Sequence, residues 1–410
     1  MQHKIGFLLH SLTASGSVLS FLHMLKAIDH DLTDYVIFLS ADAEVSESLL
    51  QQFHLTLEGK IVRTAVLPIH CHASGTQYYA EIPFIVHKGV RPLARLINEH
   101  RIDILHINTT VFSHTLSTLR SRTRAKLIVH VREMIAKGDS PRLGRYMLRS
   151  IQKYADRIIA ISDNEARQFP PSEKVVVLPN PFDPSLVPSV PSPTFREERQ
   201  IPHDTLLIGM ASTFRKSKGH LYLLRVAEAL KADASLPPIR FVVIGVQTDK
   251  EISHSLLKRT VKRTLRIVGL YTPHEELFFN YLQQHRLDDV IEPVRHTENA
   301  LSILNQCDVI VRLGESSDPW GRDIIEAMAM KKPIVATGDS EFYIKNHQTG
   351  WLVNYNDIPA TLTALKSLLT DPHARTSMGQ AGYERIIALC DPAKYGQAIL
   401  RLYRSMEDQK

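Results

Sequence analysis

The sequence predicts two α/β domains, each built on a doubly wound parallel sheet. In both halves of the 410-residue chain, short apolar runs alternate with amphipathic helical patterns. Such alternation is typical of parallel strands joined by crossover helices. Residues 179–202 contain seven prolines, as expected of a linker. A chain of this length can bury two cores of ordinary size.

The strands are expected at the apolar runs, taken in chain order. In the first half these are residues 4–10, 35–40, 61–69, 102–109, 126–132, 158–162 and 175–178. In the second half they are residues 206–211, 241–245, 290–293, 309–313 and 334–337. Ligands of open α/β sheets bind outside the carboxyl ends of the strands, so two such domains facing across a cleft would hold the active site there.

These patterns divide the chain into four parts. We predict a Rossmann-like domain at residues 1–183, a proline-rich linker at 184–203, a second Rossmann-like domain at 204–385 and a terminal helical segment at 386–410. The terminal segment is interrupted at Asp391-Pro392, and Tyr395, Ile399 and Tyr403 give it an apolar face.

Composition indicates a globular, water-soluble protein. Hydrophobic residues make up 44% of the chain and charged residues 22%, and no apolar run approaches the length that spans a bilayer. The first residues read as a strand rather than a signal peptide, so a cytoplasmic location is expected. Three scattered cysteines and twenty scattered histidines show no ligand spacing, and neither a disulfide framework nor a metal site is expected.

Positive charge is concentrated in the first half. Residues 84–157 hold fifteen Lys or Arg against five Asp or Glu, a local net charge of +10. One interpretation is a solvated helical surface. The other is attraction to an anionic acceptor or to anionic lipid headgroups, which would place the protein at the inner face of a membrane. Nucleic acid is not favoured, because no recognition module is visible.

The stretch at residues 312–337 combines a loop, a helix and a buried strand. The helix is expected to begin near Gly321, because Ile324, Ile325 and Met328 then share one face. Pro333 ends it and opens the strand. A helix N-terminus carries free N–H groups and a partial positive charge, so a diphosphate could bind near Gly321.

Two carboxylates flank this helix start. Asp318 lies in the loop and Glu326 lies eight residues later, inside the helix, and both could face a polyhydroxylated ligand. By spacing alone they could equally be solvated surface acids. The surrounding Pro-Trp-Gly-Arg and Glu-Ala-Met-Ala, however, resemble the signature of retaining glycosyltransferases of family 4, which have the GT-B fold and two glutamates separated by seven residues.

The resemblance implies roles for these side chains. Asp318 stands where the family has its first glutamate and would contact the hydroxyls of the donor sugar. Glu326 matches the second glutamate and would contact the ribose. Gly321 and Arg322 belong to the same expected nucleotide-sugar site. The aspartate is one methylene shorter than the family's glutamate, a departure that bears on donor identity.

A second motif follows the first strand of the second half. Residues 208–220 run from a strand into a helix with Lys218-Gly219 at the junction, where a lysine can bind phosphate. Alone, this could be a solvated surface turn. In the family a Gly-Arg pair precedes the Lys-Gly pair, and Lys218 matches the phosphate-binding lysine. Ser212-Thr213 replaces Gly-Arg here, which leaves Arg215 as the candidate substitute for the missing arginine.

The first domain offers two further candidates. Gly16 lies in a small-residue loop after the first strand, where backbone amides could approach a ligand; an ordinary turn is the alternative. His130 lies at the end of a strand expected in the sheet centre. Family members often have a histidine lining the donor-sugar pocket at that place, whereas without the resemblance a half-buried structural histidine fits equally well.

The resemblance as a whole implies transfer of a sugar from a nucleoside-diphosphate sugar to an acceptor hydroxyl, with retention and without a bound metal or cofactor. Asp318, Glu326, Lys218 and His130 would serve the reaction. The first domain would bind the acceptor, a carbohydrate or lipid-linked molecule of bacterial-type polysaccharide or glycolipid synthesis. The last helix would cross back to the first domain.

Two alternatives stay open: a GT-B-like nucleotide-sugar epimerase, and a non-catalytic carbohydrate-binding protein, which the departures at Asp318 and Thr213 favour. A glycan phosphorylase is disfavoured, because such enzymes are longer and need a pyridoxal-cofactor lysine.

Overall fold

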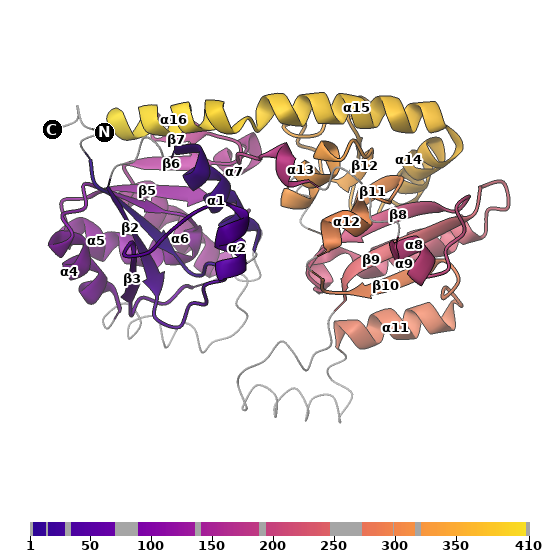
Figure 1. Ribbon diagram of the computed structural model, residues 1–410, viewed down its shortest axis with the longest axis horizontal. Helices are drawn as coiled ribbons and strands as arrows, with labels where there is room; N and C mark the ends of the chain where they lie inside the picture. The colour runs from indigo at the N-terminus through magenta and orange to yellow at the C-terminus, as the bar shows by residue number, and fades with distance from the viewer. Residues whose placement is uncertain are drawn as a thin grey trace. The chain divides into compact units, whose positions relative to one another are not determined.

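The computed structural model describes residues 3–13, 15–28, 34–69, 89–135, 141–187, 194–246, 273–297, 299–315 and 321–406. The chain divides into two compact units (Figure 1). The N-terminal unit comprises Met1–Asp183 and Leu389–Lys410, and the C-terminal unit comprises Pro184–Ala388.

The N-terminal unit is built on a seven-stranded parallel sheet of order β3-β2-β1-β4-β5-β6-β7. Its strands are β1 (Ile5–Leu9), β2 (Tyr35–Ser40), β3 (Ile61–Thr64), β4 (Ile104–Ile107), β5 (Lys126–Val131), β6 (Arg157–Ala160) and β7 (Val175–Val177). The run predicted at 61–69 forms a strand only as far as Thr64. Beyond it, Val66 and Ile69 are buried in the core without extending the ladder.

Helices pack on both faces of this sheet because its strands are apolar on both sides. They are α1 (Gly16–Ile28), α2 (Glu47–Gln52), α4 (Arg91–Glu99), α5 (Leu116–Arg122), α6 (Pro141–Tyr154), α7 (Asp163–Ala166) and α16 (Pro392–Arg404), with the 3₁₀ helix η2 at Thr110–Thr115. Phe7 packs edge-on against Phe21 of α1, and α1 contacts α16. The neighbouring Leu8 joins the opposite core with α4, α5 and α6.

The C-terminal unit has a six-stranded parallel sheet of order β10-β9-β8-β11-β12-β13. Its strands are β8 (Leu206–Ala211), β9 (Ile239–Val246), β10 (Ile291–Arg295), β11 (Val309–Arg312), β12 (Ile334–Thr337) and β13 (Trp351–Val353). The helices are α8 (Thr194–Glu198), α9 (His220–Lys231), α11 (His274–Gln284), α12 (Ala300–Leu304), α13 (Arg322–Ala329), α14 (Ile358–Thr370) and α15 (Pro372–Leu389), with 3₁₀ turns η4 (Pro184–Leu186) and η5 (Lys216–Lys218).

The core of this unit lies between the sheet and α9, α11 and α14, and α12 and α13 also contact the strands. The segment predicted as a linker contains η4 and α8, and residues 188–193 of it lie outside the described residues. No helix within the described part of the chain is long and apolar enough to cross a membrane.

Candidate functional site

In the C-terminal unit, the strand order reverses between β8 and β11. The chain proceeds from β8 outward to β9 and β10 on one side and later to β11, β12 and β13 on the other. Loops that leave such neighbouring strands diverge and open a crevice at the carboxyl ends, which is where doubly wound sheets bind ligands. The Lys218 turn follows β8, and residues 313–315 follow β11.

Gly219 brings these two loops into contact. Its φ is +80°, and a Cβ at this position would lie 1.8 Å from the carbonyl oxygen of Leu313. The amide of Glu315 also donates to the carbonyl of Ser217 over 2.9 Å. Only glycine meets both the left-handed conformation and the close approach. The turn therefore holds Lys218 at the ends of β8 and β11.

A small recess lies at this junction, and three of its side chains carry charge. Lys218 enters from η5, Arg312 from the last position of β11 and Asp323 from the first turn of α13. Arg312 Nη1 lies 2.5 Å from Asp323 Oδ2. Among the residues that the structure describes, the lining consists of Met210, Ala211, Ser212, Lys218, Val311, Arg312, Gly314 and Asp323. Within this described lining, two cations stand against one carboxylate, and the resulting positive charge suits an anionic group.

Sequence reasoning missed Arg312 and Asp323. Arg312 is the first residue of the stretch 312–337 that carries the carboxylate pattern. It lies near the end of a predicted strand, where doubly wound sheets bind ligands, so it could have been named as a candidate ligand-binding residue. Asp323 had no such signal, because an acid in the first turn of a helix is ordinary.

Helix α13 begins as the apolar spacing predicts, with Gly321 as its N-cap at a φ of +154°. A Cβ on Gly321 would lie 2.4 Å from Asp323 Oδ1, a side-chain atom that can move away, so it is the positive φ that favours glycine at this start. Asp318, the predicted partner of Glu326, lies outside the described residues.

Glu326 is instead paired with Arg322, one turn earlier. Arg322 Nε lies 2.6 Å from Glu326 Oε1, and each side chain is only 14% exposed. Burial raises the pKa of Glu326, against the opposing effect of the Arg322 charge, and burial lowers the pKa of Arg322. The pair occupies one carboxylate oxygen and orients Glu326.

Arg215 and Lys218 differ in their surroundings although they share one turn. Arg215 is the exposed N-cap of η5 and does not line the recess, whereas Lys218 is half-buried and does. Behind the turn, His220 is buried, with Nε2 3.2 Å from Ser212 Oγ and Nδ1 3.4 Å from His274 Nε2. Burial lowers the pKa of His220 to about 3, so a neutral histidine supports the turn.

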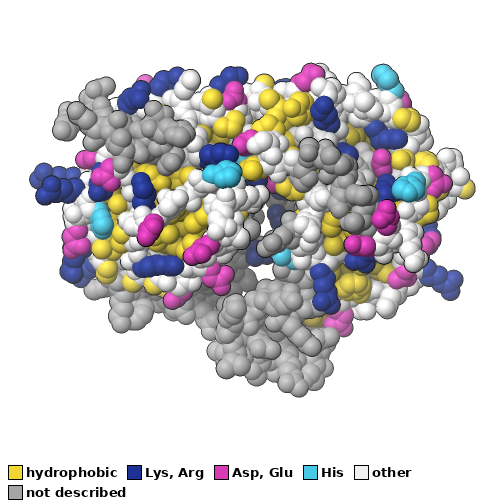
Figure 2. Space-filling view, viewed as in Figure 1, with side chains coloured by type: hydrophobic (Ala, Val, Ile, Leu, Met, Phe, Trp, Pro, Cys, Tyr) yellow, Lys and Arg dark blue, Asp and Glu magenta, His cyan; other side chains and the backbone are white. Residues whose placement is uncertain are grey.

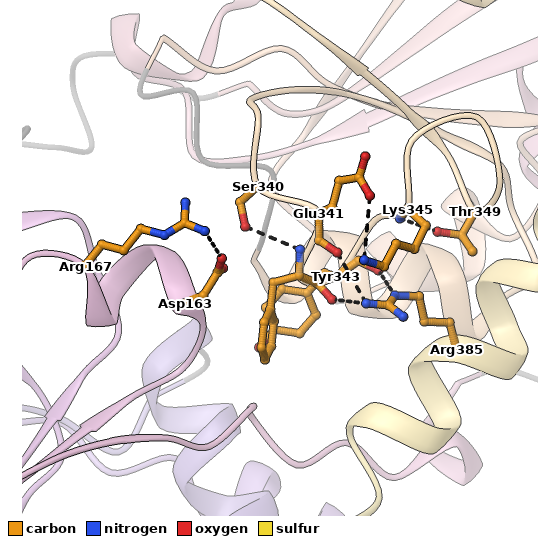
Figure 3. Close-up of polar contacts among 9 residues, drawn as sticks. Asp163, Arg167, Ser340, Glu341, Tyr343, Lys345, Thr349 and Arg385 are labelled. Carbon is orange, nitrogen blue, oxygen red and sulfur yellow. Dashed lines mark hydrogen bonds and ion pairs between the residues drawn. The ribbon is translucent and has the colours of Figure 1, made fainter. Parts of the chain in front are cut away.

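The loop after β12 is held by Arg385 from α15, as Figure 3 shows. Arg385 Nε donates to the carbonyl of Tyr343 over 2.7 Å, and its Nη2 donates to the carbonyls of Glu341, at 3.3 Å, and Phe342. The Glu341 side chain points away from this contact and lies 3.6 Å from Lys345 Nζ. Arg385 therefore holds the loop after β12, the third loop described at the carboxyl ends of the strands in the C-terminal unit.

In the N-terminal unit the corresponding reversal lies between β1 and β4. Gly16 begins α1 after β1, and no atom of the described residues lies within 4 Å of where its Cβ would be. Asn108, directly after β4, donates through Nδ2 to the carbonyl of Ser17 over 3.3 Å. This bond ties the loop after β1 to the end of β4.

His130 lies in β5 with no exposed surface and belongs to a buried polar network. Its Nδ1 lies 3.3 Å from His106 Nε2 and 3.1 Å from Arg132 Nη2. His106 Nδ1 in turn lies 2.6 Å from the hydroxyl of Tyr403 in α16. Burial, and secondarily the Arg132 charge, lowers the pKa of His106 to about 3 and that of His130 well below its ordinary value. Both histidines are therefore neutral.

The basic residues of segment 84–157 lie mainly on α4, α5 and α6, with Lys88 and Lys137 outside the described residues. On the face seen in Figure 2, Lys and Arg side chains are interspersed with acidic and apolar ones rather than gathered into one patch. Within the described ranges, no cluster of three or more His, Cys, Asp or Glu side chains could hold a metal ion.

Comparison with known families gave two matches that together span most of the chain. Residues 191–385 match the family described as glycosyl transferases group 1, and residues 18–181 match the glycosyl transferase 4-like domain. None of the curated proteins matches the sequence.

Solved structures match over the whole chain at low sequence identity. HepE of Anabaena in complex with UDP-glucose is 16% identical, with a TM-score of 0.75 over 98% of this chain and 100% of that one. Sucrose-phosphate synthase of Thermosynechococcus elongatus is 18% identical, with a TM-score of 0.74 and full coverage of both chains. A glycosyltransferase of Rickettsia africae is 17% identical, with a TM-score of 0.69 over 100% of this chain and 99% of that one. The predicted two-domain GT-B fold is confirmed.

Proposed function

Because the chain belongs to the group 1 glycosyltransferases, we propose that it transfers a sugar from a nucleoside-diphosphate sugar to an acceptor hydroxyl, with retention at the anomeric carbon and without a bound metal. The observation that carries this proposal is the positive recess where Lys218 and Arg312 meet at the start of α13. HepE, solved with UDP-glucose, makes a UDP-sugar the first donor to test.

The chemistry requires stabilisation of a departing diphosphate. The bond between the anomeric carbon and the phosphate oxygen breaks while the acceptor oxygen bonds to the same carbon from the same face. The acceptor proton passes to the departing phosphate oxygen. Lys218 and Arg312, with the N–H groups at the start of α13, would stabilise the negative charge that develops there.

The carboxylates and the N-terminal residues are proposed to position the ligands. Glu326 has Oε1 paired with Arg322 and would accept ribose hydroxyls through its other oxygen. Asp318 and His130 would contact the donor sugar, and the open backbone at Gly16 would let a ligand approach. For the acceptor we propose a carbohydrate or lipid-linked molecule of polysaccharide or glycolipid synthesis. The basic helices α4 and α6 would contact anionic lipid if that acceptor is membrane-borne.

The central test compares two lysines of one turn. Lys218 lines the recess, whereas Lys216 is exposed and does not. Losing a charge-assisted hydrogen bond costs about 1.5–3 kcal/mol, so Lys218→Ala should weaken binding of the preferred nucleotide sugar about 10- to 100-fold by calorimetry. Lys216→Ala should stay within about twofold of wild type, because the loss of one exposed charge is largely screened.

The donor is found first by thermal-shift screening of UDP, GDP, ADP and dTDP sugars, since a bound ligand stabilises the folded state. The proposal is contradicted if Lys218→Ala and Lys216→Ala bind the nucleotide sugar with equal affinity. It is also contradicted if no nucleotide sugar at millimolar concentration raises the melting temperature. Product chromatography then tests the reaction. Free nucleotide and a glycosylated acceptor support transfer, an isomerised sugar still attached to its nucleotide identifies an epimerase, and binding without turnover identifies a carbohydrate-binding protein.

A further inference from the structure

A second concave surface lies in the N-terminal unit, at the amino ends of its strands. It encloses about 550 Å³ and is formed where α4 and α5 end and where β4 and β5 begin. We call it the arginine hollow, because Arg101, Arg122 and Arg124 line it. Doubly wound sheets bind their ligands at the carboxyl ends of the strands, so the arginine hollow lies at the opposite edge of this sheet from the expected acceptor site.

Positive charge dominates the described lining of the arginine hollow, where three guanidinium groups stand against the carboxylate of Asp103. That carboxylate is already engaged, because its Oδ2 accepts from the amide of Lys4 over 2.9 Å. Arg101, Arg122 and Arg124 are exposed, and their side chains form no ion pair or hydrogen bond with any residue that the structure describes. Only solvent or a ligand can accept from these donors.

Two further carboxylates precede strands at this edge of the sheet, and both have other partners. Asp34, before β2, lies 2.9 Å from Lys4 Nζ. Asp156, before β6, lies 2.6 Å from Arg120 Nη2 and accepts from the amide of Leu127 over 2.7 Å. These acids therefore do not neutralise the arginine hollow.

Capping of α5 does not account for the arginines either. Cations near a helix C-terminus often bond its last carbonyls, but at this end those carbonyls have other donors. The carbonyl of Arg122 accepts from Asn98 Nδ2 over 2.9 Å. The carbonyl of Leu119 accepts from the amide and from the hydroxyl of Thr123, each over 2.9 Å. The guanidinium groups are thus not needed to complete the helix end.

The end of α4 is closed by backbone bonds alone. The amide of Arg101 donates to the carbonyl of Asn98, and that of Ile102 donates to the carbonyl of Ile97, each over 3.0 Å. Arg101 has a φ of +53°, a conformation in which helices usually end on glycine. Replacing Arg101 with glycine would therefore remove the guanidinium and keep the backbone.

We propose that the arginine hollow is an anion-binding site, separate from the Lys218 recess, that takes a phosphate-bearing molecule with two or more negative charges. Guanidinium groups pair with phosphate oxygens through two parallel hydrogen bonds, and like charges around a concave surface strengthen one field. Sites for small molecules enclose about 300–1,000 Å³, so the hollow admits more than a single phosphate. The phosphate belongs to a free metabolite or to a lipid headgroup, and the experiment distinguishes these sources. The inference does not depend on the proposed function.

Calorimetry of the full chain with inorganic pyrophosphate tests the first source. Arg101→Gly should weaken binding about tenfold, because a charge-assisted contact is lost. Arg286→Gly is the matched control, because Arg286 follows α11 with a φ of +51° and does not line the arginine hollow. Both changes place glycine at a positive φ, so neither should impair folding. Arg286→Gly should stay within about twofold of wild type.

Lys218→Ala separates the arginine hollow from the recess, which could also bind pyrophosphate. Binding in the arginine hollow should be the same in Lys218→Ala as in wild type, and Arg101→Gly should weaken it. If Lys218→Ala weakens binding and Arg101→Gly does not, pyrophosphate occupies the recess and free phosphate is excluded as the ligand of the hollow. The proposed donor site is not affected by that result.

Cosedimentation with vesicles of phosphatidylcholine and phosphatidic acid tests the second source. The control is Arg95→Gln, since Arg95 is exposed on α4 and does not line the arginine hollow. A headgroup in the hollow makes Arg101→Gly bind more weakly than Arg95→Gln, whereas general contact with a basic surface weakens both equally. A difference from the control in either experiment supports the inference and identifies the source. The inference is overturned if Arg101→Gly matches its control in both experiments, or if neither probe binds.

Discussion

Replacing Gly219 with alanine is the sharpest perturbation of the recess that leaves its charges in place. The added methyl group would lie 1.8 Å from the Leu313 carbonyl oxygen and 2.6 Å from the carbonyl carbon. Both are backbone atoms, so no rotamer change relieves the overlap. The residue would also keep a φ of +80°, which alanine adopts at a cost.

The expected magnitude follows from these two effects. Left-handed backbone costs an alanine about 1–2 kcal/mol, and overpacking costs typically about 1–3 kcal/mol. Together they predict a loss of about 2–5 kcal/mol in the unfolding free energy of the C-terminal unit. Ordinary contact begins at 3.4 Å, so the turn and the β11 loop must separate by about 1.6 Å. A misplacement of about 1 Å can cost about 100-fold in rate, and we expect a comparable loss of transfer.

Gly382→Ala provides the matched control in the same unit. Gly382 lies inside α15, where the nearest atoms to a new Cβ are 3.5–3.7 Å away, and alanine favours a helix by about 1 kcal/mol. Urea unfolding followed by fluorescence, together with nucleotide-release assays, compares the two variants. If Gly219→Ala has the same unfolding free energy and the same rate of nucleotide release as Gly382→Ala, the turn is not held by the contact to Leu313.

Three further predictions concern the two units separately. Tyr403→Phe leaves buried His106 Nδ1 without its 2.6 Å partner, so the unfolding free energy of the N-terminal unit should fall by about 1–3 kcal/mol in urea titration; an unchanged midpoint would show that this bond contributes nothing. His106 has a pKa of about 3 when folded and 6.5 otherwise, so the unfolded state binds an extra proton below pH 6.5, and stability is lost as pH falls. Between pH 6 and pH 4, the slope of the unfolding free energy against pH should be shallower in His106→Phe than in wild type by about 1.4 kcal/mol per pH unit. Identical slopes in the two proteins would contradict a neutral buried His106. Arg385→Met removes the donor to three carbonyls, so hydrogen exchange at residues 341–345 should accelerate, whereas rates equal to wild type would mean that the loop is held otherwise.

The sequence alone determined the fold class and the family, because both depend on local patterns. Alternating strand and helix periods require parallel sheets with crossovers, and the structure confirms two of them. The start of α13 at Gly321 was predictable for the same reason, since the apolar spacing of one helix is contained within a few residues. The roles proposed for Asp318, Glu326, Lys218 and His130 remain predictions.

Only the tertiary structure decided which polar groups meet. Lys218, Arg312 and Asp323 line one recess because β8 and β11 are neighbours in the sheet. No local sequence pattern predicts the order of strands in a sheet. His106 and Tyr403 are 297 residues apart in the sequence, yet the packing of α16 on α1 brings them within hydrogen-bond distance. Gly219 shows the same limit: the sequence shows a glycine after a lysine, and the carbonyl oxygen that excludes any side chain there belongs to Leu313, in the loop after β11. Periodicity specifies which face of an element is buried, whereas hydrogen bonds and close contacts depend on distances that exist only after the chain has folded.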